Sequence, residues 1–282
     1  MLNRTGDAKQ ELKELIKISL SGSVATVAQV CSFMWMRTIM NHQYYHGGTF
    51  KSTFNTLYKE GGVRRLYKGF GVTLLYVPMC RFGDILTNVG TVRYLNSNPE
   101  TKDLSFSTKT FCGTLLAGVW RVGISPIDAV KNSLQVNGRN ATKILRDKIK
   151  THGMRVMYHG SPMTFMTCVT RDYPWFTTYN YLNLYFDTNH KNLTKTQSVV
   201  KNAFTGLVAS GVTDALTNSL QIVKIIRQTQ SDKISYQKIV EHVVQKDGVV
   251  GLFIRGLKTR LLTNGIQGMM FSVLWNLMMQ QE

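Results

Sequence analysis

The sequence predicts an all-α membrane protein, with six transmembrane helices in three pseudo-threefold repeats and short surface helices within the repeats. Three observations lead to this fold class. A glycine motif recurs at a regular spacing, two long apolar stretches accompany each copy, and a basic segment joins the two stretches. The glycines that close the motif, Gly69, Gly160 and Gly256, lie 91 and 96 residues apart. In a chain of 282 residues, this period indicates one unit built three times within a single domain.

Each repeat holds two apolar stretches that are long enough for membrane-spanning helices. The repeats cover approximately residues 12–100, 101–195 and 196–282 of one domain, 1–282. The stretches run over about Ile16–Met40, Phe70–Tyr94, Phe106–Val136, Met157–Phe186, Val199–Gln228 and Leu252–Met279. Each exceeds the ~20 residues that a helix needs to cross a bilayer. Small residues share a register in the first stretch of each repeat, at Ser19, Gly113 and Gly206, and predict close helix contacts there.

The segment between the two stretches of each repeat is polar and basic. It contains a short amphipathic candidate helix, at Phe50–Glu60, Ala141–His152 and Tyr236–Asp247. These are too short to span a bilayer and fit helices on the membrane surface. The clustering of Lys and Arg predicts that the three segments lie on the positive side of the membrane. Since six crossings return the chain to its starting face, both termini are expected on the other side.

Charged side chains interrupt the apolar stretches. They are Arg37, Arg81, Asp84, Arg121, Arg171, Asp172, Asp214 and Lys224. A charge in hydrocarbon is costly, so these groups are expected to face a bundle interior or a water-filled cavity. Arg81 and Asp84 are one helical turn apart and are expected to form a structural pair.

The composition favours an anionic partner. The formal charge is +18, from 34 Lys and Arg against 16 Asp and Glu, which suits nucleic acid, acidic lipid or an anionic solute. Because of this charge, a soluble basic nucleic-acid-binding protein remains the alternative of a different class. No nucleic-acid-binding signature is present to support it. No phosphate-binding loop, nucleophile elbow or metal-spaced cluster predicts an enzyme or a metal site. The cysteines Cys31, Cys80, Cys112 and Cys168 lack a metal or disulfide spacing and are expected to be reduced.

The motifs themselves carry a family resemblance. The clearest copy runs from Pro126-Ile127-Asp128-Ala129-Val130-Lys131 to Tyr158-His159-Gly160, and the other copies end in Tyr67-Lys68-Gly69 and Ile254-Arg255-Gly256. In these motifs the chain resembles, over essentially its whole length, the mitochondrial carrier family. The resemblance implies a transporter that moves a small charged metabolite across the mitochondrial inner membrane by alternating access and exchange. No signal for an oligomer is found, and a monomer is expected.

The resemblance implies a gate on the matrix side, where an acid and a base at each odd helix link neighbouring helices. Proline there kinks the helix. Only the second repeat keeps the full pattern, because Ser32 and Ser219 replace the proline and Met34 and Gln221 replace the acid. The expected gate residues are Arg37, Asp128, Lys131, Lys224 and Gln221. With one acid among them, a complete ionic ring is not expected. Weaker gating, or gating by hydrogen bonds and packing, is expected instead.

The three glycine triplets are expected to bind lipid. They contribute Lys68 and Gly69, His159 and Gly160, and Arg255 and Gly256. Free N–H groups at a helix start, beside a base, form an anion site. The resemblance implies a bound cardiolipin phosphate, and no other cofactor is expected. The alternative is a glycine turn with an interfacial aromatic anchor.

The resemblance also implies where a substrate binds. Five residues before Ser32, Pro126 and Ser219, the positions implied to face the cavity hold Val27, Arg121 and Asp214. The alternative for the last two is a structural ion pair with each other. On the even helices, the implied contact points are Leu75 with Tyr76, Arg171 with Asp172, and Asn264 with Gly265.

These positions suggest the kind of solute. An arginine binds a carboxylate or phosphate through two parallel hydrogen bonds. The Arg171–Asp172 pair resembles the family's amino-acid carriers, so an amino-acid-like or carboxylate-bearing solute is the first expectation. The alternative for this pair is that the two charges neutralise each other. The high positive charge keeps a nucleotide or deoxynucleotide as the alternative cargo.

Overall fold

The computed structural model describes residues 2–189, 195–232 and 234–279, and every regular element in these ranges is a helix. The elements are α1 (Leu2–His46), α2 (Phe50–Leu66), α3 (Phe70–Ser97), α4 (Phe106–Gly123), α5 (Ser125–Asn137), η1 (Gly138–Asn140), α6 (Ala141–His152), η2 (Met154–Tyr158), α7 (Ser161–Asn189), α8 (Lys195–Thr229), α9 (Tyr236–Ile254) and α10 (Leu257–Met279). The predicted all-α fold is confirmed.

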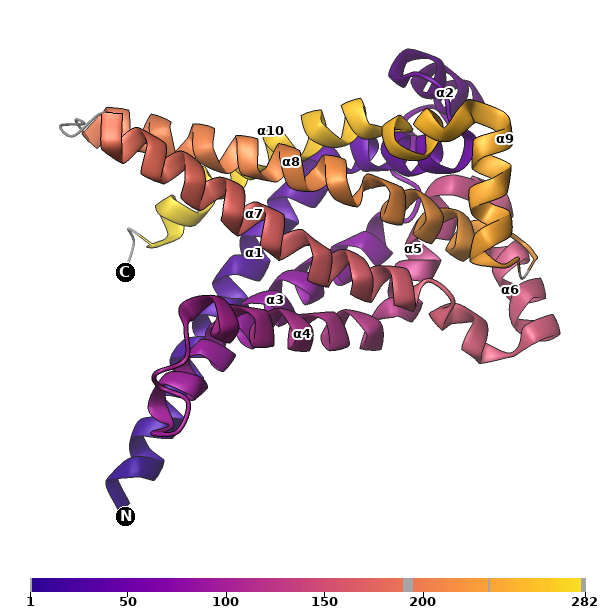
Figure 1. Cartoon of the computed structure of the whole chain (residues 1–282). Coiled ribbons are helices and arrows are strands. Elements are labelled where there is room, and N and C mark those ends of the chain that lie inside the picture. Colours follow the sequence, from indigo (N-terminus) through magenta and orange to yellow (C-terminus); the bar gives the residue numbers. More distant parts are fainter. Residues whose placement is uncertain (1, 190–194, 233, 280–282) are drawn as a thin grey trace.

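The long helices form a closed ring. Helix α1 packs on α3, α3 on α4, α4 on α7, α7 on α8, α8 on α10, and α10 returns to α1. The short helices α2, α6 and α9 lie together at one end of this bundle, at the right of Figure 1. The first turns of α1 and the last turns of α10 lie toward the other end. At the end with the short helices, α1, α5 and α8 contact one another, so the ring narrows there.

Proline decides which odd helix is broken. Helices α4 and α5 are separated at Ile124, just before Pro126, and the two segments are bent by 63°. Proline has no N–H to donate and its ring clashes with the preceding turn, so it ends or kinks a helix. Helices α1 and α8 carry Ser32 and Ser219 at the corresponding positions and run through without a break.

Apolarity along the described helices is interrupted. Within the described residues, no single helix contains an 18-residue window that is both apolar enough and poor enough in charge for a membrane span. The bent pair Phe106–Gly123 and Ser125–His152 meets this test as a pair.

The surface helices begin where predicted. A capping box starts α2: Ser52 N–H donates to Thr49 Oγ1 (3.3 Å) and Thr49 N–H donates to Ser52 Oγ (3.2 Å). Helix α6 has the predicted bounds. Helices α2 and α9 continue past their predicted ends after a break at a left-handed glycine, Gly62 (φ 61°) or Gly248 (φ 71°). Glycine adopts this conformation without a Cβ penalty.

Three basic side chains tie each repeat to the next at the end with the short helices. Arg65 donates to the carbonyls of Gln135 and Val136, both at 2.8 Å. Lys148 donates to three carbonyls at the end of α8, the shortest bond being 2.9 Å to Gln230. Arg255 donates to the carbonyls of Tyr44 and Tyr45, both at 3.3 Å. Each base thus satisfies helix-end carbonyls that lack a partner within their own helix.

Candidate functional site

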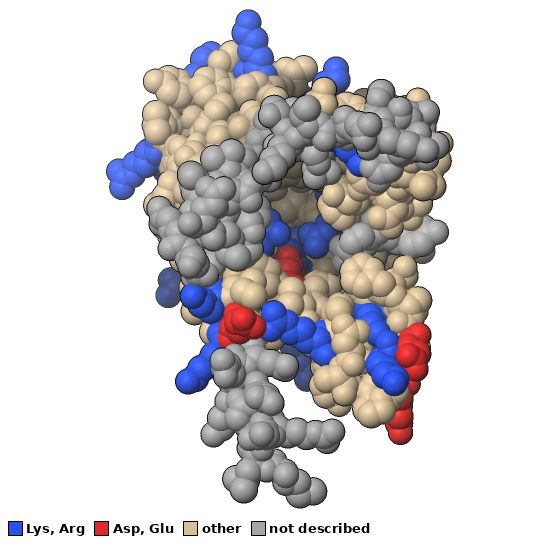
Figure 2. All heavy atoms as spheres, turned by 90° about the vertical axis from the view of Figure 1, so that its left-hand side faces the viewer, with Lys and Arg blue, Asp and Glu red and all other residues tan. Residues whose placement is uncertain are grey.

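A cavity of about 850 Å³ lies inside the ring of long helices. Its lining includes side chains from α1, α3, α4, α7, α8 and α10, so all three repeats contribute. Figure 2, viewed from the end opposite the short helices, shows a hollow with basic and acidic side chains at its depth. Charged residues that interrupt the apolar stretches, among them Arg81, Arg121, Arg171 and Asp214, line it.

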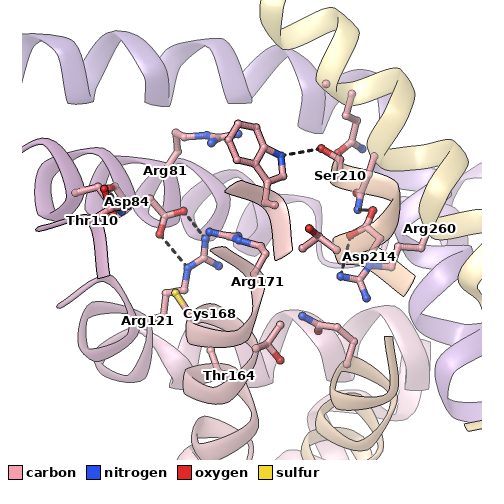
Figure 3. A pocket seen from close by; sticks show the side chains of 18 of the residues that line it. Arg81, Asp84, Thr110, Arg121, Thr164, Cys168, Arg171, Ser210, Asp214 and Arg260 are labelled. Atoms are coloured by element: carbon pink, nitrogen blue, oxygen red, sulfur yellow. Dashed lines mark hydrogen bonds and ion pairs between the residues drawn. The ribbon is translucent and has the colours of Figure 1, made fainter. Parts of the chain in front are cut away.

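One ion pair stands on the α3–α4 side of the cavity. Arg121 Nε lies 3.0 Å from Asp84 Oδ1, and Arg121 Nη2 lies 2.5 Å from Asp84 Oδ2, a two-point arrangement (Figure 3). The alternative of an ion pair between Arg121 and Asp214 is therefore wrong, because Arg121 pairs with Asp84. The partner of Arg121 comes from the neighbouring helix α3.

A second ion pair stands on the α8–α10 side. Arg260 Nη2 lies 2.9 Å from Asp214 Oδ1, and Asn264 Nδ2 donates to Asp214 Oδ2 at 2.7 Å. Arg260 also donates to Thr217 Oγ1 at 2.8 Å. The predicted residues Asp214 and Asn264 are thus in direct contact. Arg260, which the sequence analysis missed, completes the group, and its position four residues before Asn264 was the available signal.

Arg171 lies between the two ion pairs. It belongs to α7 and points into the cavity (Figure 3). The side chain of its predicted partner, Asp172, lies outside the described residues. The cavity wall near Arg171 includes Cys168 and Thr164 from the same helix and Ser210 from α8. Arginine and hydroxyl donors therefore come from several helices toward one space.

The narrow end of the cavity is closed by a buried carboxylate with two lysines. Asp128 Oδ1 lies 2.6 Å from Lys131 Nζ, and Asp128 Oδ2 lies 2.8 Å from Lys224 Nζ. Arg37 instead donates to Gln267 Oε1, and Gln221 lines the cavity beside this layer. The single acid therefore joins two of the three repeats, and the third is attached through an amide.

A layer of amide side chains lies next to Asp128, toward the end with the short helices. It was not predicted from the sequence. Asn41 Nδ2 donates to Gln135 Oε1 at 2.5 Å, and Asn132 Nδ2 donates to Gln228 Oε1 at 2.6 Å. Asn41, Gln135 and Gln228 share a register, nine residues after Ser32, Pro126 and Ser219. That equivalence was readable from the repeats, but uncharged amides did not stand out as the charged residues did.

Leu75 requires a correction. Its side chain is 54% exposed and belongs to the outer face of α3, while the next residue, Tyr76, is buried. Tyr76 lines a smaller cavity of about 270 Å³ at the narrow end, where Lys131 Nζ lies 4.2 Å from the centre of its ring. Of the aligned pair Leu75 and Tyr76, Tyr76 is therefore the residue that lines a cavity. Val27 likewise is 38% exposed and is absent from the described lining of both cavities.

The three glycine triplets differ in structure. Gly69 (φ 86°) and Gly256 (φ 69°) adopt the left-handed conformation before α3 and α10. Gly160 has no room for a Cβ, which would lie 2.5 Å from Gln228 Cγ. Lys68 and His159 are half-buried. Arg255 was expected to bind a lipid phosphate, and this expectation is wrong. Its guanidinium is buried, where it pairs with Asp247 and donates to the carbonyls of Tyr44 and Tyr45 at the end of α1.

Known proteins that are similar to this chain are mitochondrial carriers. Residues 102–190 and 195–280 match the mitochondrial carrier protein family. Mitochondrial substrate carrier family protein D of Dictyostelium discoideum is 23% identical over 278 residues, covering 83% of this chain and 80% of that protein. The mitochondrial carnitine/acylcarnitine carrier protein of Rattus norvegicus is 25% identical over 226 residues, covering 74% and 71%. Mitochondrial carrier protein CoAc1 of Zea mays is 28% identical over 155 residues, covering 49% of this chain and 43% of that protein.

Proposed function

This chain belongs to the mitochondrial carrier family, so it is a transmembrane solute transporter of mitochondria and not an enzyme. We propose that its cargo is a small carboxylate-bearing anion. We propose the inner membrane as its location, crossed six times, and alternating access with exchange as its mechanism. The observation that carries the cargo proposal is the charge of the central cavity. Its described lining holds seven Lys and Arg but only two Asp.

The arrangement of those charges supports a specific binding mode. Asp84 pairs with Arg121 and Asp214 pairs with Arg260, and Arg171 points into the cavity between these two ion pairs. The Arg171 guanidinium would bind the carboxylate of the solute through two hydrogen bonds. The polar group formed by Asp214, Asn264 and Arg260 would receive the other end of the solute.

Transport would couple binding to the closed layer at the narrow end. A ligand shifts an equilibrium between two conformations only by its difference in affinity for them. Asp128, Lys131 and Lys224 hold this end closed in the present conformation, and the solute would offset the cost of separating them. With one shared acid, we propose that this gate depends on amide contacts as much as on ion pairs.

A nucleotide or deoxynucleotide is the second candidate cargo. The excess of bases over acids in the cavity is larger than a single carboxylate neutralises, which favours a polyanion. The cavity volume of about 850 Å³ also suits a ligand larger than an amino acid.

The main test is uptake by the purified protein in liposomes. Arg171→Ala is expected to reduce uptake to the level of protein-free liposomes without preventing membrane insertion. Arg155→Ala removes an exposed base in η2, outside the cavity lining, and is the matched control that should transport normally. Unchanged transport by Arg171→Ala would exclude this residue from the site. Competition by an unlabelled amino acid but not by ATP would favour the carboxylate cargo, and the reverse would favour the nucleotide.

We further propose that the carrier acts as a monomer and binds cardiolipin at Lys68 with Gly69 and at His159 with Gly160. Both triplets precede the first turn of a long helix, where unpaired N–H groups favour an anion.

We expect no nucleic-acid partner, since the bases of the cavity face the bundle interior. Retention in the membrane pellet during carbonate extraction tests this, because a soluble basic protein would be released.

A further inference from the structure

We propose that a second, basic pocket, on the face formed by the short helices, binds a soluble phosphate-bearing anion. The pocket has a volume of about 890 Å³. It lies between the end of α1, helix α2 and the junction of α5 with η1. Among the described residues, its lining shares no member with either cavity inside the bundle. This basic pocket is therefore separate from the central cavity.

The charge in the basic pocket is strongly positive. Arg64 and Arg139 line it, and within the described part of the chain neither has an ion-pair partner. Lys68, the proposed cardiolipin contact, also lines it and is not counted here. Glu60 is the acid of this lining, and it is held by Arg65 at 2.8 Å. The two remaining cations come from α2 and from η1. An anion with several charged oxygens can neutralise cations from several directions, whereas a monocarboxylate cannot.

His42 places a buried polar atom without a described partner beside the basic pocket. Its side chain lines the basic pocket and is 8% exposed, and its Nδ1 is buried without a hydrogen-bond partner among the described residues. A buried polar atom without a partner costs free energy, so such atoms are rare in folded proteins. Burial, the neighbouring His46 and Arg65 lower the pKa of His42 to about 3, so the ring is neutral. A neutral imidazole still donates one N–H, and a phosphate oxygen would accept it.

The lining favours a soluble anion over a lipid. Val136 is the only aliphatic side chain among the described lining residues of the basic pocket. The rest are charged, amide, hydroxyl, imidazole or glycine residues, including Thr53, Thr56 and Asn140. The acyl chains of a phospholipid would find no apolar surface here, and their contact with polar groups would be unfavourable.

The test is ligand-dependent stabilisation of the full-length protein in detergent, with pyrophosphate as the probe at constant ionic strength. A ligand that binds the folded state raises the thermal unfolding midpoint with its concentration. The wild type should show a saturable rise. The double variant Arg64→Gln/Arg139→Gln should bind pyrophosphate at least about ten-fold more weakly, since two charge-assisted contacts are lost. Lys143→Gln/Arg155→Gln removes two exposed bases outside the pocket and should bind as the wild type.

The proposal is overturned if the wild type shows no saturable rise, if both double variants weaken binding equally, or if cardiolipin alone stabilises the protein. Binding that persists in Arg171→Ala assigns the effect to the basic pocket, whereas binding lost there assigns it to the central cavity and contradicts the proposal. His42→Phe keeps a ring of similar size without a donor and should also weaken binding. Because Arg64 and Arg139 are exposed, their variants remain informative if the His42 variant does not fold.

Discussion

Arg121 and Asp214 both line the central cavity, as their shared position in the repeat predicts, yet each pairs with a residue that the repeat does not point to. Arg121 pairs with Asp84 of α3, and Asp214 pairs with Arg260 of α10. A position in a repeat fixes the direction of a side chain from its helix. Its partner depends on which neighbouring helix brings an opposite charge to the same depth.

At the residue scale, His42 predicts a pH dependence of stability. Its pKa is about 3 in the folded protein, against an ordinary value near 6.5, so between these values only the unfolded chain is protonated. Stability therefore falls as the pH decreases from about 6.5 toward 3. His42→Phe should flatten this fall in a series of thermal unfolding measurements. The control His152→Phe, at an exposed position, should keep the wild-type slope, and identical slopes in all three proteins would contradict the assignment.

At the element scale, glycine decides how closely α3 and α4 approach. A Cβ on Gly83 would lie 2.1 Å from Trp120 of α4, which is too close for any real contact. Gly113 of α4 is similar, since a Cβ there would lie 2.9 Å from Asn88 Cα, as the small-residue register predicted. Gly206, in the same register, has no described atom within 4 Å of a Cβ. The register therefore marks a close contact in the second repeat and, among the described residues, none in the third.

The two kinds of glycine give a direct comparison. Gly83→Ala should reduce stability by about 1–3 kcal/mol, because the ring of Trp120 must move. Gly206→Ala should be neutral or slightly stabilising, because alanine is the better helix former and space is available. Thermal unfolding in detergent measures both. Equal effects of the two substitutions would show that the α3–α4 contact is looser than described.

At the scale of the whole molecule, three basic side chains close the ring of repeats. Arg65 of the first repeat caps α5 of the second, Lys148 of the second caps α8 of the third, and Arg255 of the third caps α1 of the first. The bases come from different positions in their repeats, so the shared role is not visible as a motif. The common cause is the set of unpaired carbonyls at the end of each odd helix.

Loss of one of these bases should loosen a junction between repeats. Arg255→Met is expected to reduce stability by about 2–3 kcal/mol, since hydrogen bonds to a charged group are lost and Asp247 loses its partner. Lys258→Met removes an exposed base three residues away and should have little effect. The unfolding midpoint in detergent provides the measurement. A midpoint for Arg255→Met equal to that of Lys258→Met would exclude a role for this cap.

The sequence by itself determined the helical class, the triplication, the surface helices and most of the charged residues of the central cavity. These follow from local rules, because apolar length, glycine turns and the cost of charge in apolar spans are properties of single segments. The tertiary structure decided the ion-pair partners, the side chains of α3 that face inward, the amide layer under Asp128 and the basic pocket. Each of these depends on the distance and rotation between helices from different repeats, which packing sets and no single segment encodes.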